Sequence, residues 1–554
     1  MIIPFKQNTD GAWTSHPRPQ FKRADYYILN EGWTLEGQTI RVPFPPQAKL
    51  SEYTGNIPDE LTYLCHFSIP ATFRKKRILL HFGAVDQLAK VYINDVFIGE
   101  NEGGYIPFTF DVTEHVCRDK ENTLKVIATD SLCLDYPYGK QTKKPSGMWY
   151  TPVSGIWQNV WLENVADTYV TQLKINTTLE QIELQIEYNH DRNATEVFEV
   201  TVDLPKGQKL TQSFADKRGI LSIPEPVQWS PEHPHLYYMT IRAGEDSFDS
   251  YFALRTINIE TINDVKRVCL NHKPIFLHGV LDQGYFHDGL FLPKEEAGYD
   301  TDILNMKELG FNLLRKHIKI EPDYFYYACD KLGMLVMQDM VNSGPYSFLR
   351  DTALPTIGLK KKKDIHLPKD NRRRLIFEEQ TRLTIEHLYN HPCIVAYTIF
   401  NEGWGQFDSD EMYDYVKALD NTRLVDSTSG WFTQKKSDFD SKHIYFRLKK
   451  LKVKERPLFV SECGGYQLLD KQHFFGNKEY GYGTCKDSED LTNRIVKMYE
   501  EMIIPGIPAG VCGCIYTQIT DVEGEINGLY TYDRRGCKVE KGKMIEVANK
   551  LKIK

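Results

Sequence analysis

The sequence lacks any long uncharged apolar stretch and any sign of a secretory leader. No segment reaches the roughly 18 apolar residues that a membrane-spanning helix needs. The N-terminal stretch MIIPFKQNTDGAWTSHPRPQ has neither the basic first region nor the apolar core that a signal peptide combines. These absences predict a cytoplasmic protein with no membrane partner.

The chain also lacks an excess of basic residues. It has 68 Lys and Arg against 75 Asp and Glu, which gives a formal net charge of −7. Proteins that bind nucleic acid usually carry a basic field, so this balance argues against a nucleic-acid partner. A local basic patch is compatible with this net charge.

The cysteines lack the paired spacing of a zinc site, and no Gly-rich phosphate loop is present. Cys512 and Cys514 lie one residue apart without a His pair beside them, as strand residues do. The total of 11 cysteines is odd, which in a long chain favours buried reduced thiols over a disulfide framework. We therefore expect no bound metal and no cofactor.

What the sequence does contain is enough apolar material for several domains. Its length of 554 residues and hydrophobic content of 41% predict three to four domains, or two smaller ones and a large barrel. Residues 1–165 read as short alternating strands with turn signals, such as Asn94-Asp95, and predict a jelly-roll sandwich. Residues 166–260 continue the pattern and predict an immunoglobulin-like sandwich.

From residue 261 the pattern changes to short apolar runs that alternate with helical stretches. Eight runs, from PIFLHGV to CGCIYTQITD, predict eight parallel strands, and residues 261–554 therefore a (β/α)8 barrel. The links after the fifth and sixth runs are short and poorly helical. A basic segment, 343–374, follows the third run and includes Lys360–Lys363. It is interpreted as a solvated loop or as a rim over the barrel mouth.

Polar side chains gather where the predicted strands end, which in a barrel is the catalytic face. Two carboxylates stand out, because Glu402 follows the run IVAYTIF and Glu462 follows PLFV on strands that lie across the barrel. Two carboxylates about 5–5.5 Å apart carry out retaining glycoside hydrolysis, one as acid/base and one as nucleophile. The other strand-end side chains are His278, Asp282, Gln283, Tyr285, Arg315, His317, Asp339, Asn401, Asp426, His443, Tyr445, Tyr516, Gln518 and Asp521.

The motifs together resemble glycoside hydrolase family 2, which includes β-galactosidases, β-glucuronidases and β-mannosidases. The matching pieces run along nearly the whole chain and include RPQFKR, PSGMWYTPVSGIWQNVWLE, FLHGVLDQGYF, IVAYTIFNEGWGQFD and RPLFVSECGGY. The resemblance implies the order jelly roll, immunoglobulin-like sandwich and barrel. It also implies a retaining exo-glycosidase that acts on terminal sugars of a carbohydrate substrate, and allows a homo-oligomer.

Carried over residue by residue, the resemblance assigns Glu402 as acid/base and Glu462 as nucleophile. Asn401 falls on the residue that bonds the sugar 2-hydroxyl, and Arg315 on the arginine that supports the nucleophile. The sequence departs from the galactosidase and glucuronidase patterns in KHIKIEP and SECGGY. Tyr516 stands at the place of a sugar-platform Trp, which Trp404 or Trp431 could supply instead. The full set of expected substrate-binding residues is Asn401, Arg315, His317, Asp282, Asp339, Trp404, Trp431, His443, Tyr445 and Tyr516.

Three rival interpretations remain open. The first is a non-catalytic carbohydrate-binding protein with a degenerate barrel, which the presence of both glutamates disfavours. The second is a metal-dependent hydrolase using His278, His317 and Asp339, which come from adjacent strands but include no HxH pair. The third is a phosphate-binding barrel, which the missing Gly-rich loop disfavours.

Overall fold

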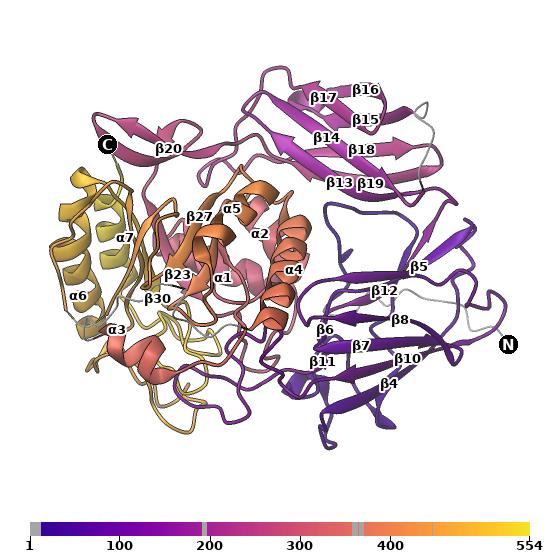
Figure 1. The fold of residues 1–554 in the computed structure, drawn as a ribbon, viewed down its shortest axis with the longest axis horizontal. Coiled ribbons are helices and arrows are strands. Elements are labelled where there is room, and N and C mark those ends of the chain that lie inside the picture. Colours follow the sequence, from indigo (N-terminus) through magenta and orange to yellow (C-terminus); the bar gives the residue numbers. More distant parts are fainter. Residues whose placement is uncertain (1–12, 191–196, 357–363, 365–369, 446, 554) are drawn as a thin grey trace.

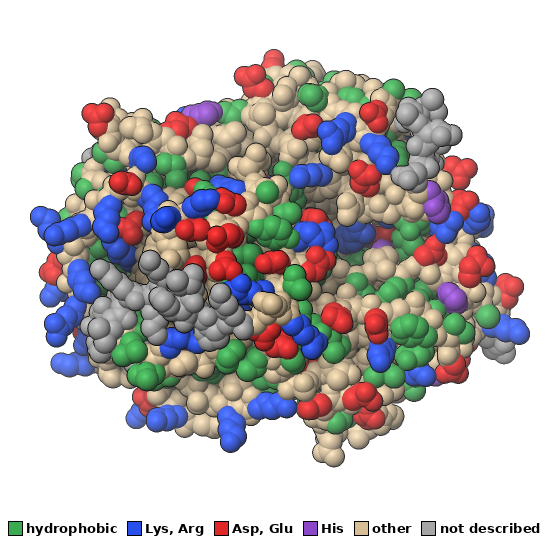
Figure 2. Space-filling view, viewed as in Figure 1, with side chains coloured by type: hydrophobic (Ala, Val, Ile, Leu, Met, Phe, Trp, Pro, Cys, Tyr) green, Lys and Arg blue, Asp and Glu red, His purple; other side chains and the backbone are tan. Residues whose placement is uncertain are grey.

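The chain folds into three packed parts (Figure 1). The computed structural model describes residues 13–190, 197–356, 364, 370–445 and 447–553. A barrel, coloured from pink to yellow, lies at the left of Figure 1, and two sandwiches lie at the right, one below the other. Figure 2 shows basic and acidic side chains interspersed over the same face.

The first part is a two-sheet antiparallel sandwich. In β10 (Asn122–Thr129) buried and half-buried residues alternate along the strand, because successive side chains point to opposite faces of the sheet. Asn94 and Asp95 form the predicted tight turn, with φ values of 49° and 66°. The larger sheet has the order β3 (Gln38–Thr39), β2 (Trp33–Leu35), β4 (Glu60–Phe67), β10 (Asn122–Thr129), β7 (Leu88–Ile93) and β8 (Val96–Glu102). The smaller sheet has the order β1 (Tyr26–Ile28), β12 (Val160–Val165), β5 (Arg77–Phe82) and β9 (Phe108–Asp111), and β6 (Val85–Asp86) pairs with β11 (Gly155–Ile156).

The second part is a seven-stranded sandwich with its own hydrophobic core. One sheet has the order β13 (Val170–Thr177), β14 (Gln181–Tyr188) and β17 (Arg218–Ser222). The other has the order β16 (Lys209–Ala215), β15 (Val197–Asp203), β18 (Tyr237–Ala243) and β19 (Asp246–Phe252). The layout agrees with the expected immunoglobulin-like sandwich, while the domain limits at 165 and 260 stay predictions.

The third part is the expected parallel barrel. Its eight strands follow the order β27 (Leu424–Ser429), β26 (Ile394–Asn401), β25 (Leu335–Asp339), β24 (Leu313–Lys316), β23 (Leu277–Asp282), β30 (Val511–Thr517), β29 (Leu458–Gly464) and β28 (Asp440–Ile444). The ring closes between β27 and β28, where Asp438 N donates to Val425 O at 2.9 Å. Apolar residues of β20 (Ile257–Ile262) and β21 (Val265–Leu270), which continue into β22 (Lys273–Pro274), pack against the apolar side chains of the barrel strands.

Helices cover the outside of the barrel. Gly333 follows α2 (Asp323–Leu332) in the left-handed conformation, which is common at helix C-termini because glycine adopts it without strain. The links after β27 and β28, the fifth and sixth barrel strands, contain no helix within their described residues, as expected. The helices are α1 (Ala297–Glu308), α2 (Asp323–Leu332), α3 (Leu354–Thr356), α4 (Asn371–Leu388), α5 (Ser409–Leu419), α6 (Ser488–Met498) and α7 (Lys541–Lys550).

Two further expectations can be compared with the structure. All 11 cysteines are free thiols and most of them are buried, which confirms the prediction from their spacing. Among the described residues, no helix is both long and apolar enough to cross a membrane. Cytoplasmic location and homo-oligomerisation stay predictions from the sequence.

Candidate active site

Glu402 sits directly after β26, at the mouth of the barrel. Its backbone adopts the left-handed conformation with φ of 54°, and its N–H donates to Ser429 O at 2.9 Å. Gly403 follows with φ of 74°, and a Cβ there would lie 2.1 Å from the Phe432 ring. The left-handed conformation costs a non-glycine residue such as Glu402 about 1–3 kcal/mol, and strain of this kind concentrates at functional sites. The strained turn directs the carboxylate toward the barrel axis.

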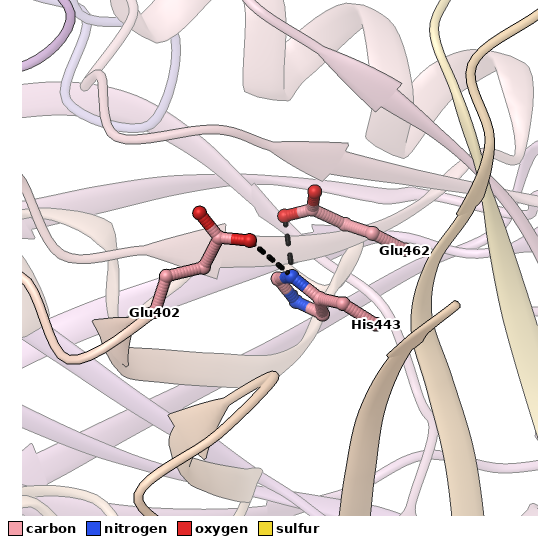
Figure 3. Close-up of side chains that lie close together, drawn as sticks. All are labelled: Glu402, His443 and Glu462. Carbon is pink, nitrogen blue, oxygen red and sulfur yellow. Dashed lines mark hydrogen bonds and ion pairs between the residues drawn. The ribbon is translucent and has the colours of Figure 1, made fainter. Parts of the chain in front are cut away.

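Glu462, from β29, faces Glu402 across the mouth, and His443 lies between them (Figure 3). One carboxylate oxygen of each glutamate and one ring nitrogen of His443 all lie within 4.8 Å of one another. His443 Nδ1 is 2.8 Å from Glu402 Oε1, and Nε2 is 3.5 Å from Glu462 Oε1. The two glutamates therefore meet as the strand-end pattern predicted.

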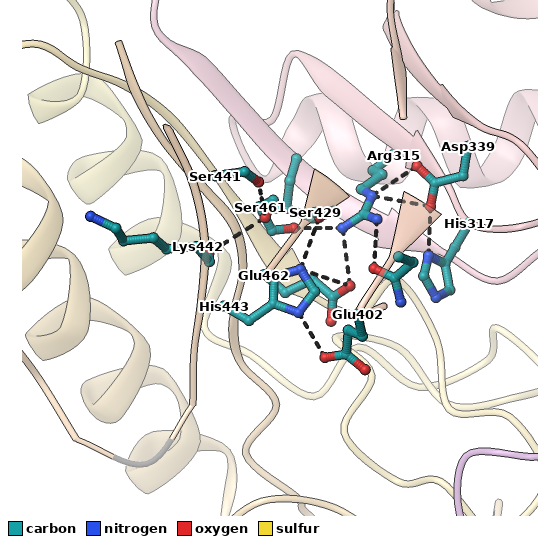
Figure 4. Close-up of polar contacts among 12 residues, drawn as sticks. Arg315, His317, Asp339, Glu402, Ser429, Ser441, Lys442, His443, Ser461 and Glu462 are labelled. Carbon is teal, nitrogen blue, oxygen red and sulfur yellow. Dashed lines mark hydrogen bonds and ion pairs between the residues drawn. The ribbon is translucent and has the colours of Figure 1, made fainter. Parts of the chain in front are cut away.

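Arg315, from β24, fixes the position of Glu462 (Figure 4). Its Nη1 donates to Glu462 Oε1 at 3.0 Å, and its Nη2 donates to Asn401 Oδ1 at 3.0 Å. Its Nε donates to both oxygens of Asp339, at 3.0 and 3.1 Å. Asp339 also bonds His317 Nδ1 at 2.7 Å. Arg315 and Asp339 are almost fully buried, and their side chains bond Glu462 and His317.

Tyr445, which follows β28, donates its hydroxyl to Glu462 Oε2. Arg315 and Tyr445 thus each donate to one carboxylate oxygen of Glu462. Burial opposes the ionisation of Glu462, but His443, Arg315 and His317 and the Tyr445 hydrogen bond outweigh it and lower its pKa to about 2. Glu462 is therefore a carboxylate at any ordinary pH. Burial also lowers the pKa of His317, to about 4.

Asp426 of β27 is a buried acid inside the barrel. Neither of its oxygens has a hydrogen-bond partner among the described residues, and the neighbouring Ser441 hydroxyl donates to Ser461 instead. Burial raises the pKa of Asp426 to about 6. The strand-end pattern pointed to Asp426, but it gave no sign that the side chain would be left without a partner.

The two tryptophans considered as a stacking surface for the sugar donate hydrogen bonds to loops at the barrel mouth. Trp404 is 3% exposed and donates its Nε1 to Gly344 O at 2.8 Å. Trp431 is 5% exposed and donates to Asp351 O at 3.0 Å and to Glu402 O at 3.1 Å. The acceptors Gly344 and Asp351 belong to the segment 343–374, so its described part does line the rim. Its tract Lys360–Lys363 lies outside the described residues.

Two expected substrate-binding residues lie elsewhere. Asp282 points out of the barrel, where its carboxylate accepts from Lys316 Nζ at 2.5 Å. Its neighbour Leu281 occupies the apolar cluster inside the barrel, so strand alternation turns Asp282 away from the mouth. Tyr516 is completely buried and packs beside Gly464 in the main hydrophobic cluster.

The first sandwich contributes side chains that the strand-end pattern could not find. Its loop between β10 and β11 reaches the barrel mouth, where Tyr138 N donates to Asn342 O at 3.0 Å. On this loop Trp149 packs edge-on against Trp404, with ring centroids 5.0 Å apart. Lys140 lies close enough to His317 and to Glu525 for its charge to act on both groups. The only sequence signal for this loop was the motif PSGMWYTPVSG, which carries no chemical pattern of its own.

Of the three candidate metal ligands in the rival interpretation, His317 and Asp339 lie together, but His278 lies apart from them. His278 bonds Gly310 O and the Tyr499 hydroxyl, at 2.9 and 3.2 Å, among the residues that pack outside the barrel strands. Among the described residues, the one group with metal-like spacing is Glu402, His443 and Glu462.

Comparison with protein families matches all three parts to one family. Residues 261–462 match the TIM barrel domain of glycosyl hydrolases family 2. Residues 48–151 match the glycosyl hydrolase 2 galactose-binding domain-like family, and residues 164–255 match glycosyl hydrolases family 2.

Curated relatives and solved structures resemble the chain over much of its length. A β-galactosidase of Thermoanaerobacter pseudethanolicus is 27% identical over 65% of this chain and 47% of its own length. One of Priestia megaterium is 24% identical over 85% of this chain and 47% of its own. The chain thus spans about half the length of these relatives. The structure of a β-D-glucuronidase from Dictyoglomus thermophilum superposes with a TM-score of 0.74 at 16% identity, over 97% of this chain and 98% of the other. A β-galacturonidase from Eisenbergiella tayi gives 0.67 at 19%, over 96% and 98%. At these identities the structures show a shared fold.

Proposed function

The chain belongs to glycoside hydrolase family 2, and from this premise we propose that it is a retaining exo-glycosidase that removes terminal sugars by double displacement. The observation that carries the proposal is the pair Glu402 and Glu462, with oxygens within 4.8 Å of each other. Retaining enzymes need their carboxyl groups about 5–5.5 Å apart, whereas inverting enzymes need room for a water between them. The spacing supports retention.

In the proposed first step, Glu462 attacks the anomeric carbon of the sugar. It forms a glycosyl–enzyme ester while Glu402 gives a proton to the departing oxygen. The low pKa of Glu462, about 2, supports its role as nucleophile. Arg315 and Tyr445 hold one carboxylate oxygen each, which orients the carboxylate for attack.

In the proposed second step, Glu402 takes a proton from water, which attacks the anomeric carbon and releases Glu462. His443 bonds Glu402 at 2.8 Å and so orients that carboxylate. Asn401 accepts from Arg315 through Oδ1, and its Nδ2 donates to no described residue. That amide is therefore available to bond the sugar 2-hydroxyl.

The charge at the mouth bears on the substrate class. The Lys140 ammonium makes no ion pair or hydrogen bond with a described residue, yet its field reaches His317 and Glu525. An unpaired cation beside a sugar site favours a substrate that carries a carboxylate. Among β-galactosides, β-glucuronides and related glycosides, we propose uronides as the preferred class.

Azide rescue tests the two roles. The variant Glu402→Ala should keep its first step on dinitrophenyl glycosides, because that leaving group needs little protonation, and should stall before hydrolysis. Azide needs no base and should restore turnover, giving a glycosyl azide of retained configuration. With Glu462→Ala, azide should give the inverted product. Rescue of neither variant, or reversed stereochemistry, would overturn the assignment.

The non-catalytic alternative has a separate test. A carbohydrate-binding protein with a degenerate barrel would bind glycosides without hydrolysing any member of a panel of nitrophenyl glycosides. Turnover that disappears in Glu462→Ala excludes it, and no turnover by the unmodified protein on any member would support it.

A further inference from the structure

A second cavity lies on the flank of the barrel and shares no lining residue with the site around Glu402 and Glu462. Its volume is about 590 Å³, within the range of about 300–1,000 Å³ typical of small-molecule sites. All three parts of the protein form its walls: β5, β9 and β12 of the first sandwich, β13 of the second, and α2, α4 and α5 of the barrel. In Figure 2 the surface is hollowed where the two right-hand lobes meet the barrel.

Two cations line this cavity without an anionic partner. The Arg18 guanidinium lies over the Phe21 ring, 4.4 Å from its centroid, and its side chain makes no hydrogen bond or ion pair with a described residue. Lys174 Nζ lies 4.1 Å from the centroid of the Tyr389 ring and is likewise unpaired within the described part of the chain. Desolvation lowers the pKa of Arg18, so an anion bound beside it would offset the cost of its burial.

The acids that line the same cavity are already engaged. The lining charges that have no hydrogen-bond or ion-pair partner among the described residues are therefore the two cations, and an anionic group on a ligand complements them. The engaged pairs are Asp323 with His387 at 2.8 Å, Glu386 with Arg382 at 2.5 Å, and Glu296 with Ser15 at 2.6 Å.

The remaining walls suit a polar ring. Gln158 is 7% exposed, and its amide has no hydrogen-bond partner among the described residues. This amide lines the cavity and can exchange hydrogen bonds with a ligand hydroxyl. Phe108 and Leu383, both half-buried, supply apolar surface beside it.

We propose that this cavity binds a small anionic sugar, a monosaccharide that carries a carboxylate or a phosphate. Arg18 and Lys174 bond the anionic group, Gln158 bonds a hydroxyl, and the apolar walls contact the ring. Because the three parts share the cavity, the ligand bridges them and stabilises their docked arrangement. The site is independent of the proposed hydrolysis.

Calorimetric titration and thermal unfolding of the full chain test the proposal with glucuronate, glucose 6-phosphate, glucose and inorganic phosphate. Glucuronate or glucose 6-phosphate should bind, and at 100 times its Kd should stabilise the folded state by about 2.7 kcal/mol, which raises Tm. Whichever of the two binds identifies the anion, and glucose should not bind. Arg18→Met should weaken binding about tenfold or more, the loss expected for a charge-assisted hydrogen bond.

Two matched variants make the test decisive. Arg242→Met removes an arginine whose side chain is 68% exposed on β18, and should leave the affinity unchanged. Glu402→Gln alters the barrel mouth and should also leave it unchanged. The proposal fails if neither sugar anion binds, or if inorganic phosphate binds as tightly as glucose 6-phosphate. It also fails if Arg18→Met and Arg242→Met have the same affinity for the sugar anion, or if Glu402→Gln abolishes binding.

Discussion

Nη1 of Arg315 donates to Oε1 of Glu462 at 3.0 Å, which joins the ends of two strands that lie on opposite sides of β23 and β30. Both side chains are almost fully buried, so the pair interacts with little screening by solvent. The guanidinium thereby sets both the charge and the direction of the carboxylate.

Replacing Arg315 with lysine keeps a positive charge but loses the forked geometry with which the guanidinium bonds Asp339, Ser461 O, Glu462 and Asn401 at once. The pKa of Glu462 should then rise from about 2, because burial would be less well opposed. We expect kcat/KM to fall by about 100-fold or more, and the acid limb of its pH profile to move to higher pH.

Arg423→Lys is the matched control, because Arg423 is also buried and pairs with Asp420 at 3.1 Å away from the mouth. It should lower stability without moving the acid limb. An unchanged acid limb in Arg315→Lys would contradict the electrostatic role.

Removing the hydroxyl of Tyr445 should slow catalysis without disturbing the fold. Tyr445→Phe deletes the hydrogen bond to Glu462, and bonds to charged groups contribute about 1.5–3 kcal/mol. We expect a fall of about 10- to 100-fold in kcat/KM for nitrophenyl glycosides. Tyr413→Phe loses a comparable bond, to Asp438 at 2.8 Å on the outside of the barrel, and should keep full activity. Equal activity of the two variants would argue against a role for Tyr445.

Lys140 should discriminate between acidic and neutral sugars. Lys140→Met should lower kcat/KM for β-glucuronides and β-galacturonides by about 10- to 100-fold and leave β-galactosides within about threefold, since only a carboxylate loses its partner. Lys143→Met is the control, because that side chain is 59% exposed and pairs with Asp59. Equal losses on acidic and neutral substrates would show that Lys140 does not read the carboxylate.

Asp426 predicts a stability that depends on pH. The pKa of Asp426 is raised to about 6 in the folded state, whereas it is near 4 in the unfolded chain. The stability that its protonated form contributes is therefore fully present below about pH 4 and is lost as pH rises through about 6. Asp426→Asn removes that loss. The variant should gain up to about 3 kcal/mol over the unmodified protein between pH 4 and pH 8, measured by denaturant unfolding.

Asp420→Asn should behave in the opposite way. Burial raises the pKa of Asp420, but Arg423 and the Thr422 hydrogen bonds lower it overall. The stability that the ionised Asp420 contributes is therefore present above its pKa in the unfolded chain and is lost as pH falls. That variant should be destabilised at neutral pH and should approach the unmodified protein in acid. If the free energy of unfolding changed with pH in the same way in Asp426→Asn and Asp420→Asn, the opposite pKa shifts of these two buried acids could not explain it.

Local sequence pattern predicted much of the catalytic face. Apolar runs of strand length that end in a polar residue located Glu402, Glu462 and Arg315, because parallel strands of a barrel all end at one face. The same reasoning failed at Asp282 and at Tyr516. Side chains alternate across a strand, so a shift of one residue decides whether a strand-end group faces the axis or the helices.

The sequence by itself determined the order of two sandwiches and a barrel and the two glutamates at the barrel mouth, because these follow from periodicity and strand ends, which are local. Only the tertiary structure decided that Lys140 and Trp149 of the first sandwich join the barrel mouth, and that Arg18 and Lys174 share a cavity with α4. Such contacts depend on how separately patterned domains dock. Docking arises from surface complementarity between residues far apart in the chain, for which a single sequence has no periodic signal.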